Sequence, residues 1–120
     1  MVELYFKNSK FIGKFYKISS KDEIKKIIAE LRLEYKKATH VCYGYLLDNN
    51  GVQAAGFSDD GEPKNTAGKP IYELLRIKNL TGYLVVVVRF FGGVKLGAGG
   101  LIKAYRKTAI ATVELIESQK

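Results

Sequence analysis

Several residue types are scarce in this chain, and each shortage narrows the range of folds and sites. Of its 120 residues, one is cysteine, one is histidine, two are proline and none is tryptophan. A single cysteine cannot form an internal disulfide, and with one histidine it cannot complete a zinc site, so Cys42 indicates a reducing compartment. We expect Cys42 to be a small buried hydrophobe in a strand.

Long apolar segments are also missing. The longest apolar run, Leu84 to Val88, is far shorter than the roughly 20 residues that span a bilayer. Polar residues interrupt the N-terminal segment MVELYFKNSKFIGKFYK every few positions, so no signal peptide is expected. We therefore predict a cytoplasmic protein that does not associate with membranes.

Negative charge is scarce in the second half of the chain. Residues 61–120 carry ten basic and four acidic side chains, a net of +6, whereas residues 1–60 have a net of +2. Between residues 64 and 107 the one acid is Glu73, against nine Lys or Arg. Such a field favours phosphates, nucleic acid or an acidic protein surface as partners. The alternative is that the charge serves solubility alone.

The hydrophobic pattern predicts one domain, residues 1–120, with the element order ββαββαβα. Strands are expected at 4–8, 11–18, 39–47, 52–57 and 83–91, and helices from Ser20 to about 35, at 67–78 and at 99–117. The strand at 83–91 belongs in the centre of the sheet because Val85–Val88 is apolar on both faces. We expect an α+β domain of two layers, with the helices on one face of a mixed sheet.

Three turns and helix starts have local signatures. Ser20 and Glu23 match a capping box, and Asp48-Asn49-Asn50-Gly51 is typical of a hairpin turn. Thr66 is expected to cap the helix at 67–78, where Pro70 fits because the first turn has no intrahelical N–H bond to lose.

A glycine-rich corner joins the strand at 83–91 to the last helix. Five glycines fall between Gly92 and Gly100, with Lys95 among them. A strand–loop–helix corner of this kind presents backbone N–H groups at the positive end of a helix and suits an anion. The spacing fits neither a Walker motif nor a dinucleotide fingerprint. The alternative is a tight turn packed against the protein itself.

Basic residues surround this corner. Arg89 precedes it, and Lys103, Arg106 and Lys107 lie in the first two turns of the helix. Cations near a helix N-terminus face an unfavourable dipole, and a bound anion would reverse that effect. The alternative is a solvated basic helix face.

A second loop, residues 58–70, is rich in acids. Asp59, Asp60 and Glu62 could coordinate Mg²⁺ or Ca²⁺, but the spacing does not fit an EF-hand. The alternatives are turn formation by N–H capture and internal pairing with the basic residues. His40 and Cys42 lack an orienting acid, so we predict no catalytic set, no cofactor and no metal site.

These two loops together resemble the signature of the IMPACT family, which includes the bacterial YigZ proteins. The resemblance rests on Ser58–Pro63, Thr66–Gly68, Pro70-Ile71, Val86–Leu101 and Ala104-Tyr105, with Ser9–Ile12 and Ala38–His40 adding to it. It covers nearly the whole chain. The sequence departs from the family pattern at Lys64 and Asn65 (usually Ser-Gly), at Phe90 (usually Tyr) and at Lys103 (commonly Arg).

The resemblance implies a ribosomal-protein-type fold with a left-handed βαβ crossover. Bacterial members of the family carry a second, ferredoxin-like domain, which we do not expect in a chain of this length. Eukaryotic members bind the co-activator of the amino-acid-starvation kinase. The resemblance therefore implies a non-enzymatic binding or regulatory module linked to translation or stress. The alternative is a protein that binds phosphate, a nucleotide or nucleic acid through the glycine-rich loop.

We predict one binding surface, built from both loops. The expected partner is a translation-associated protein or RNA, including the ribosome, with a phosphate-containing ligand as a further option. The predicted binding residues are Asp59, Asp60, Gly61, Glu62, Thr66, Gly68, Arg89, Gly92, Gly93, Lys95, Gly97, Gly99, Gly100, Lys103 and Tyr105.

Overall fold

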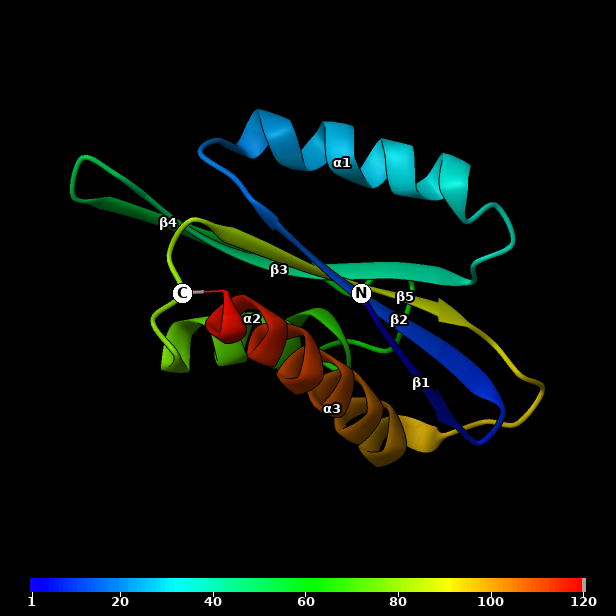
Figure 1. Cartoon of the computed structure of the whole chain (residues 1–120). Coiled ribbons are helices and arrows are strands. Elements are labelled where there is room, and N and C mark those ends of the chain that lie inside the picture. The colour runs from blue at the N-terminus through cyan, green and yellow to red at the C-terminus, as the bar shows by residue number, and fades with distance from the viewer. Residues whose placement is uncertain (120) are drawn as a thin grey trace.

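A computed structural model describes residues 1–119 and has the predicted element order (Figure 1). The elements are β1 (Val2–Phe6), β2 (Ser9–Lys17), α1 (Lys21–Glu34), β3 (His40–Asn49), β4 (Val52–Ser58), α2 (Gly68–Ile77), β5 (Tyr83–Phe90) and α3 (Gly97–Ser118). Among these residues, no helix is both long and apolar enough to cross a membrane.

The five strands form one sheet in the order β1-β2-β5-β3-β4, so β5 is central as predicted. Every neighbouring pair is antiparallel, and the expectation of a mixed sheet is therefore wrong. The sheet does contain strands that run parallel to each other, but an antiparallel strand separates each such pair. The sheet places β3 between β4 and β5, and β5 between β2 and β3.

Helices cover both faces of the sheet, which corrects the prediction of two layers with helices on one face. Figure 1 shows α1 above the sheet and α2 with α3 below it. The alternation of β5 explains this arrangement. Val85 and Val87 join the cluster under α2 and α3, whereas Val86 and Val88 join the cluster under α1. A strand that is apolar on both sides needs cover on both sides.

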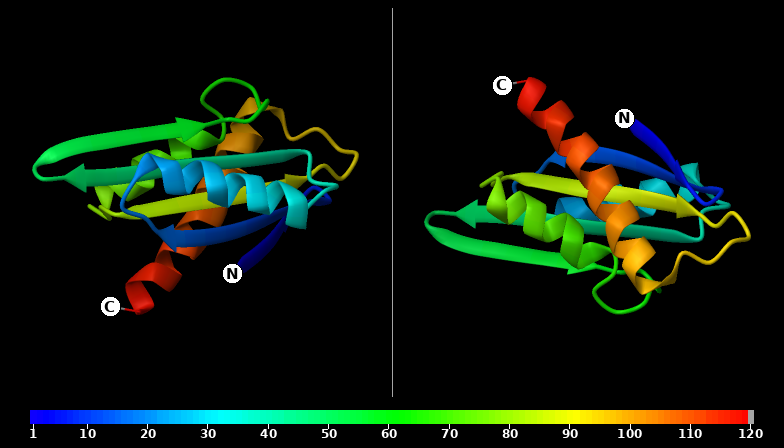
Figure 2. Two further views of the ribbon diagram at one scale, coloured as in Figure 1. Left: turned by 90° about the horizontal axis from the view of Figure 1, so that it is seen from above. Right: turned by 90° about the horizontal axis from the view of Figure 1, so that it is seen from below.

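The two helical crossovers have opposite hands. In Figure 2 the chain passes from β4 through α2 to β5 on the face that carries α3, and this connection is left-handed, as the family resemblance implies. The connection from β2 through α1 to β3 lies on the other face and is right-handed, the hand that most crossovers between parallel strands take.

The start of α1 confirms the predicted capping box. Glu23 Oε2 accepts hydrogen bonds from the backbone N–H groups of Ser19 and Ser20, at 2.5 and 3.1 Å. These bonds lower the pKa of Glu23. Ile24 and Leu31 are buried against the sheet, as the apolar spacing predicts.

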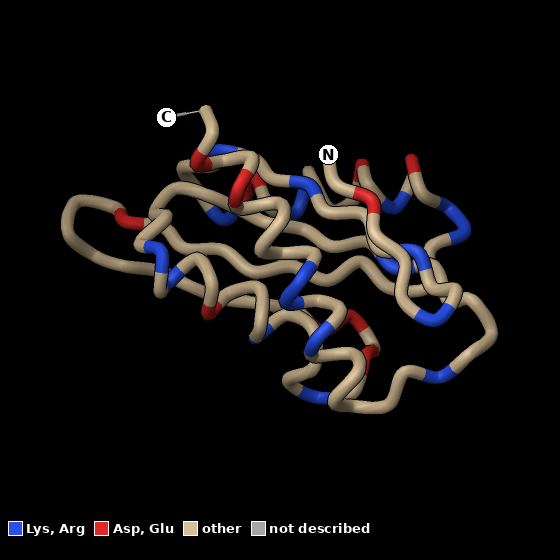
Figure 3. Tube along the Cα trace, turned by 60° about the horizontal axis from the view of Figure 1, so that its bottom comes forward, with Lys and Arg blue, Asp and Glu red and all other residues tan. Residues whose placement is uncertain are grey.

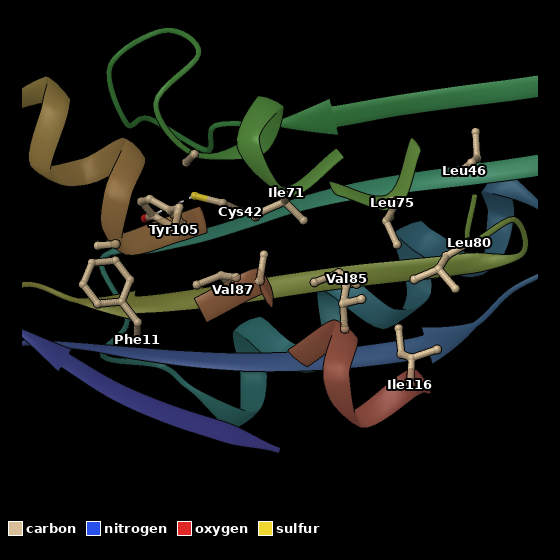
Figure 4. Close-up of a cluster of buried hydrophobic side chains, with 14 of the residues drawn as sticks. Phe11, Cys42, Leu46, Ile71, Leu75, Leu80, Val85, Val87, Tyr105 and Ile116 are labelled. Carbon is tan, nitrogen blue, oxygen red and sulfur yellow. Dashed lines mark hydrogen bonds between the residues drawn. The ribbon is translucent and has the colours of Figure 1, made fainter. Parts of the chain in front are cut away.

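The larger core lies between the sheet and the pair α2 and α3 (Figure 4). The aromatic rings of Phe11 and Tyr105 meet edge to face, with centroids 5.1 Å apart, and Cys42 lies beside Tyr105. Cys42 is fully buried in β3, as predicted. This end of the core supports the two loops that the sequence singles out.

Candidate binding site

The acidic loop, residues 58–68, is held by its own carboxylates, beginning with Asp59. Asp59 Oδ1 accepts hydrogen bonds from the N–H groups of Ala67 and Gly68, at 3.1 and 2.9 Å, and Oδ2 accepts one from Asn65. Asp59 therefore caps α2 from outside the helix. The prediction that Thr66 caps this helix is wrong, because its hydroxyl donates to the Pro63 carbonyl at 2.6 Å.

Asp60 ties the same loop to β3 and α1. Its Oδ2 accepts the N–H of Val41 at 2.6 Å, and its Oδ1 accepts Arg32 Nη2 at 2.8 Å. Its carbonyl accepts a hydrogen bond from His40 Nδ1 at 2.7 Å. Beside it, Gly61 has a φ of +85° and faces the His40 imidazole. The loop is fixed at its centre as well as at its end.

Glu62 is the third acid, and it is buried under the loop. Its carboxylate accepts Arg89 Nη1 at 3.0 and 2.8 Å, and it accepts a short hydrogen bond from the Tyr105 hydroxyl. His40 Nε2 lies 3.4 Å from Oε1. The Glu62 and Arg89 side chains are 3% and 6% exposed. Burial of this charge pair is tolerable because further donors satisfy the carboxylate.

The three carboxylates thus point to different partners instead of converging, so internal pairing is the alternative that the structure supports. Within residues 1–119, no group of three His, Cys, Asp or Glu side chains is arranged to hold a metal ion.

Arg89 connects the acidic loop to the start of β2. Its Nη2 lies 3.3 Å from Ser9 Oγ, and the same oxygen accepts the N–H of Gly92 at 3.2 Å. The guanidinium lies between the rings of Phe11 and Phe91, 5.6 and 5.5 Å from their centroids. Among the described residues, Arg89 Nε is buried without a hydrogen-bond partner.

Cys42 and Tyr105 lie beneath this network. The Cys42 sulfur is 3.1 Å from the Asp59 carbonyl oxygen and 3.5 Å from the Tyr105 hydroxyl. Burial raises the pKa of the Cys42 thiol and, together with Cys42 and Glu62, the pKa of the Tyr105 hydroxyl. Both groups are therefore protonated at neutral pH and supply no thiolate or phenolate nucleophile.

The glycine-rich loop, residues 91–96 together with the first turn of α3, is built differently. Gly92 packs against the β1–β2 turn so closely that a Cβ there would overlap the Asn8 carbonyl. Gly93 and Gly97 have φ of +88° and +73°, and a Cβ on Gly97 or Gly99 would meet nothing within 4 Å. Of the glycines in this loop, Gly92 is the one that the protein's own packing requires.

The N-terminus of α3 has free donors. No side chain caps it, and no acceptor among residues 1–119 takes a hydrogen bond from the N–H of Gly97, Ala98 or Gly99. Among the same residues, Lys95 has no carboxylate within ion-pair distance. Free amides at a helix N-terminus beside a free cation are the arrangement that binds anions.

The two loops enclose a cavity of about 440 Å³, which we call the inter-loop cavity. Its lining combines apolar side chains, the buried charge pair and the start of α3. The lining residues are Thr39, His40, Glu62, Pro63, Arg89, Phe91, Lys95, Leu96, Gly97, Ala98 and Leu101. Its volume lies within the range of about 300 to 1,000 Å³ that is usual for ligand sites.

The predicted binding residues fall into four groups around this cavity. Those that line it are Glu62, Arg89, Lys95 and Gly97. Those that shape the loops or the core beneath are Asp59, Asp60, Gly61, Thr66, Gly68, Gly92 and Tyr105. Those in the exposed glycine-rich segment are Gly93 and Gly99, and those in a neighbouring hollow are Gly100 and Lys103.

Sequence reasoning missed His40 and Phe91 as cavity residues. The sequence indicated no acid beside His40, yet His40 contacts Glu62 and lines the cavity. For the neighbouring ion pair one signal was available: Arg89 is the one charged residue of the strand Tyr83–Phe90, and a buried guanidinium needs a carboxylate nearby.

The neighbouring hollow, of about 250 Å³, is basic. Lys7, Lys103 and Lys107 line it together with Phe6, Leu96 and Gly100, and we call it the basic hollow. Figure 3 shows basic positions along the part of α3 that lies away from the C-terminus, with acidic positions near that end. Among residues 1–119, none of the three lysines forms an ion pair.

The sequence model of the Impact N-terminal domain matches residues 7–113. The chain belongs to the IMPACT family. The family member YvyE of Bacillus subtilis (strain 168) is 41% identical over 107 residues, covering 88% of this chain and 48% of that protein. The family member YigZ of Escherichia coli (strain K12) is 39% identical over 100 residues, covering 82% and 49%.

Solved structures agree with this assignment. A crystal structure described as that of a hypothetical protein matches with a TM-score of 0.87 and 35% identity, over 94% of this chain and 55% of the other. The structure of the two-domain translational regulator Yih1 matches with a TM-score of 0.56 and 21% identity, over 92% and 45%, which shows a shared fold. The chain spans about half the length of the family members it matches.

Proposed function

We propose that this chain is a non-enzymatic binding module linked to translation control, and that it recognises a translation-associated protein around the inter-loop cavity. The observation that carries the proposal is the contrast between the two walls of that cavity. The carboxylates of the acidic wall form internal hydrogen bonds and ion pairs, whereas Lys95 and the first amides of α3 have no internal partner among residues 1–119. Ligand sites are usually largely pre-formed and carry a few placed polar groups, which agrees with this arrangement.

The family supports the link to translation. A structural relative is described as the translational regulator Yih1, and the family's relatives include the protein IMPACT of Rattus norvegicus, which is 37% identical over 81 residues. A binding role also fits the chemistry of the site. Glu62, Tyr105 and Cys42 are each engaged in internal contacts, so none of them is placed to act as an activated base or nucleophile.

A pull-down from cell extract tests this proposal. The tagged chain is expected to retain an identified translation factor or ribosome-associated protein, and Lys95→Glu is expected to reduce its recovery at least tenfold. Lys95 is exposed, so the substitution leaves the fold intact. The matched control is Lys26→Glu, an exposed lysine on α1, on the opposite face of the sheet. Equal recovery by wild type and Lys95→Glu would show that the cavity is not the recognition site.

The basic hollow favours a second candidate function, which is binding of single-stranded RNA. Three lysines without an ion pair among residues 1–119 line the hollow together with Phe6 and Leu96, so phosphate contacts and an apolar surface for bases lie together. If these lysines neutralise three phosphates, the slope of log K against log salt is expected to be about −2.

Fluorescence anisotropy with a labelled oligonucleotide between 50 and 200 mM salt measures that slope. The double variant Lys103→Ala, Lys107→Ala is expected to make it shallower by between one and two, and Lys25→Ala with Lys26→Ala on α1 is the matched control. A flat salt dependence, or an unchanged slope in the double variant, would exclude this candidate.

A further inference from the structure

We propose that the inter-loop cavity binds one specific chemical group, a phosphate or carboxylate attached to an apolar body about the size of an aromatic ring. This inference rests on the proposed function, because it takes the same cavity as the recognition site, and it adds the chemistry of what enters. The group can belong to a free small molecule or to a side chain of the partner protein, and the experiment below separates these sources.

The body of the ligand follows from the walls. Phe91, Leu96, Leu101 and Pro63 line the cavity, and Phe91 is 48% exposed although it is a large aromatic side chain. Apolar walls with a few polar groups are the usual composition of a small-ligand pocket. A purely ionic ligand such as inorganic phosphate would leave these walls in contact with water.

The charge of the ligand follows from one side of the cavity. Lys95 and the N–H groups of Gly97 and Ala98 lie on this side, and among residues 1–119 neither amide has an acceptor. The helix dipole adds positive potential at the same place. Gly97 has no side chain to cover these donors, and a Cβ there would meet open space. A ligand anion can therefore approach the helix end directly.

An independent observation comes from the buried wall. Arg89 lines the cavity and is buried, and its Nε lacks a partner among the described residues. Glu62, the one carboxylate in the lining, is already paired with Arg89 and accepts a hydrogen bond from the Tyr105 hydroxyl. An entering anion therefore meets a positive side and no uncompensated negative charge.

Titration of the full chain with phenyl phosphate, followed by the backbone amide signals in NMR, tests the inference. We expect saturable shifts at Phe91 and at Gly97 to Gly99. We expect phenyl phosphate to bind at least tenfold more tightly than inorganic phosphate and than phenol, because each of these lacks one half of the recognised group. Benzoate in place of phenyl phosphate shows whether a carboxylate suffices.

Two variants assign the binding to this cavity. Lys95→Ala removes the free cation, and Ala98→Glu places a carboxylate at the rim, where the helix N-terminus tolerates it. Each is expected to weaken phenyl phosphate binding about tenfold or more, whereas Lys26→Ala on α1 is expected to change it less than twofold. Absence of shifts at 10 mM phenyl phosphate, or equal affinity in both variants and wild type, would overturn the inference.

A competition experiment shows whether the recognised group belongs to the partner protein or to a free ligand. If phenyl phosphate releases the protein retained in the pull-down, the group belongs to the partner, and if it binds without releasing that protein, the group belongs to a free ligand. Failure of this inference is distinguishable from failure of the proposed function. Loss of the partner in Lys95→Glu without any phenyl phosphate binding would refute only the ligand chemistry.

Discussion

The two loops on either side of the inter-loop cavity differ in where their polar groups find partners. The acidic loop directs Asp59, Asp60 and Glu62 inward, where N–H groups, Arg32 and Arg89 satisfy them. The glycine-rich loop is fixed at Phe91 and Gly92, whereas the amides of Gly97 to Gly99 and Lys95 have no internal partner among residues 1–119. A loop rich in charged residues can therefore serve the fold alone, whereas a loop of glycines with few side chains can leave donors available for a ligand.

The largest effect is expected from removing Glu62, the buried acid of the acidic loop. Glu62→Ala leaves Arg89 buried without its partner, so the free energy of unfolding is expected to fall by about 3–5 kcal/mol. Urea denaturation measures the change. In the double variant Glu62→Ala, Arg89→Met the loss is expected to be smaller, because no buried charge remains. A loss below about 1 kcal/mol in the single variant would mean that the pair is not structural.

Gly92 tests the fixed end of the glycine-rich loop, where it packs against the β1–β2 turn. A Cβ at this position would overlap the Asn8 carbonyl, so Gly92→Ala is expected to destabilise the fold by about 1–3 kcal/mol. Thermal unfolding against wild type checks this value. An unchanged midpoint would show that the β1–β2 turn yields easily.

High pH tests the groups beneath the acidic loop. Burial raises the pKa values of Cys42 and Tyr105 in the fold, whereas the unfolded chain titrates near the ordinary values of 9.0 and 10.0. The unfolded state therefore loses protons first. Stability falls by about 1.4 kcal/mol per pH unit above pH 9 because of Cys42, and by about as much again above pH 10 because of Tyr105.

Unfolding in urea at pH 8, 9, 10 and 10.5 measures this dependence. Cys42→Ala is expected to move the onset of the decline from about pH 9 to about pH 10, since Tyr105 alone then contributes. Stability that is constant over this range would contradict the inferred burial of both protons.

Asp59 tests the capped N-terminus of α2, in contrast to the uncapped N-terminus of α3. Asp59→Ala removes the acceptor for the N–H groups of Ala67 and Gly68 and is expected to lower stability by about 0.5–2 kcal/mol. Asp59→Asn keeps one acceptor oxygen and is the control, with a smaller loss. Equal stability of Asp59→Ala and wild type would mean that α2 needs no cap.

Gly99 gives the smallest expected effect and the opposite sign. It lies in the first turn of α3 with open space where a Cβ would be, so Gly99→Ala is expected to stabilise the fold by up to about 1 kcal/mol. Differential scanning calorimetry can resolve this gain. A loss instead of a gain would indicate a packing role for Gly99.

Much of the fold could be predicted from local patterns, because each pattern acts within a few residues. The capping box at Ser20 and Glu23, the turn before Gly51 and the central place of β5 are examples. The cover of both sheet faces was missed, although Val85–Val88 already required it. The cap of α2 was assigned to Thr66 because the sequence cannot show that Asp59 folds back onto this helix end.

The candidate site was harder to predict because its contacts are distant along the chain. Arg89 and Glu62 are 27 residues apart, and Arg89 and Ser9 are 80 residues apart. Residue types and motifs could identify the loops, but the direction of each carboxylate depends on which strands are neighbours. His40 joined the cavity for the same reason, since β3 brings it under Gly61.

The position of β5 has a consequence for how the chain is made. Without Tyr83 to Phe90, the strands reduce to two separate hairpins, β1 with β2 and β3 with β4, that share no common strand. Of the five strands that the structure describes, the one that unites them is synthesised last. Its pairing with β2 also closes a long loop, which slows folding relative to local contacts. Nascent chains that stop before Tyr83 would therefore expose two unfinished sheet edges at once.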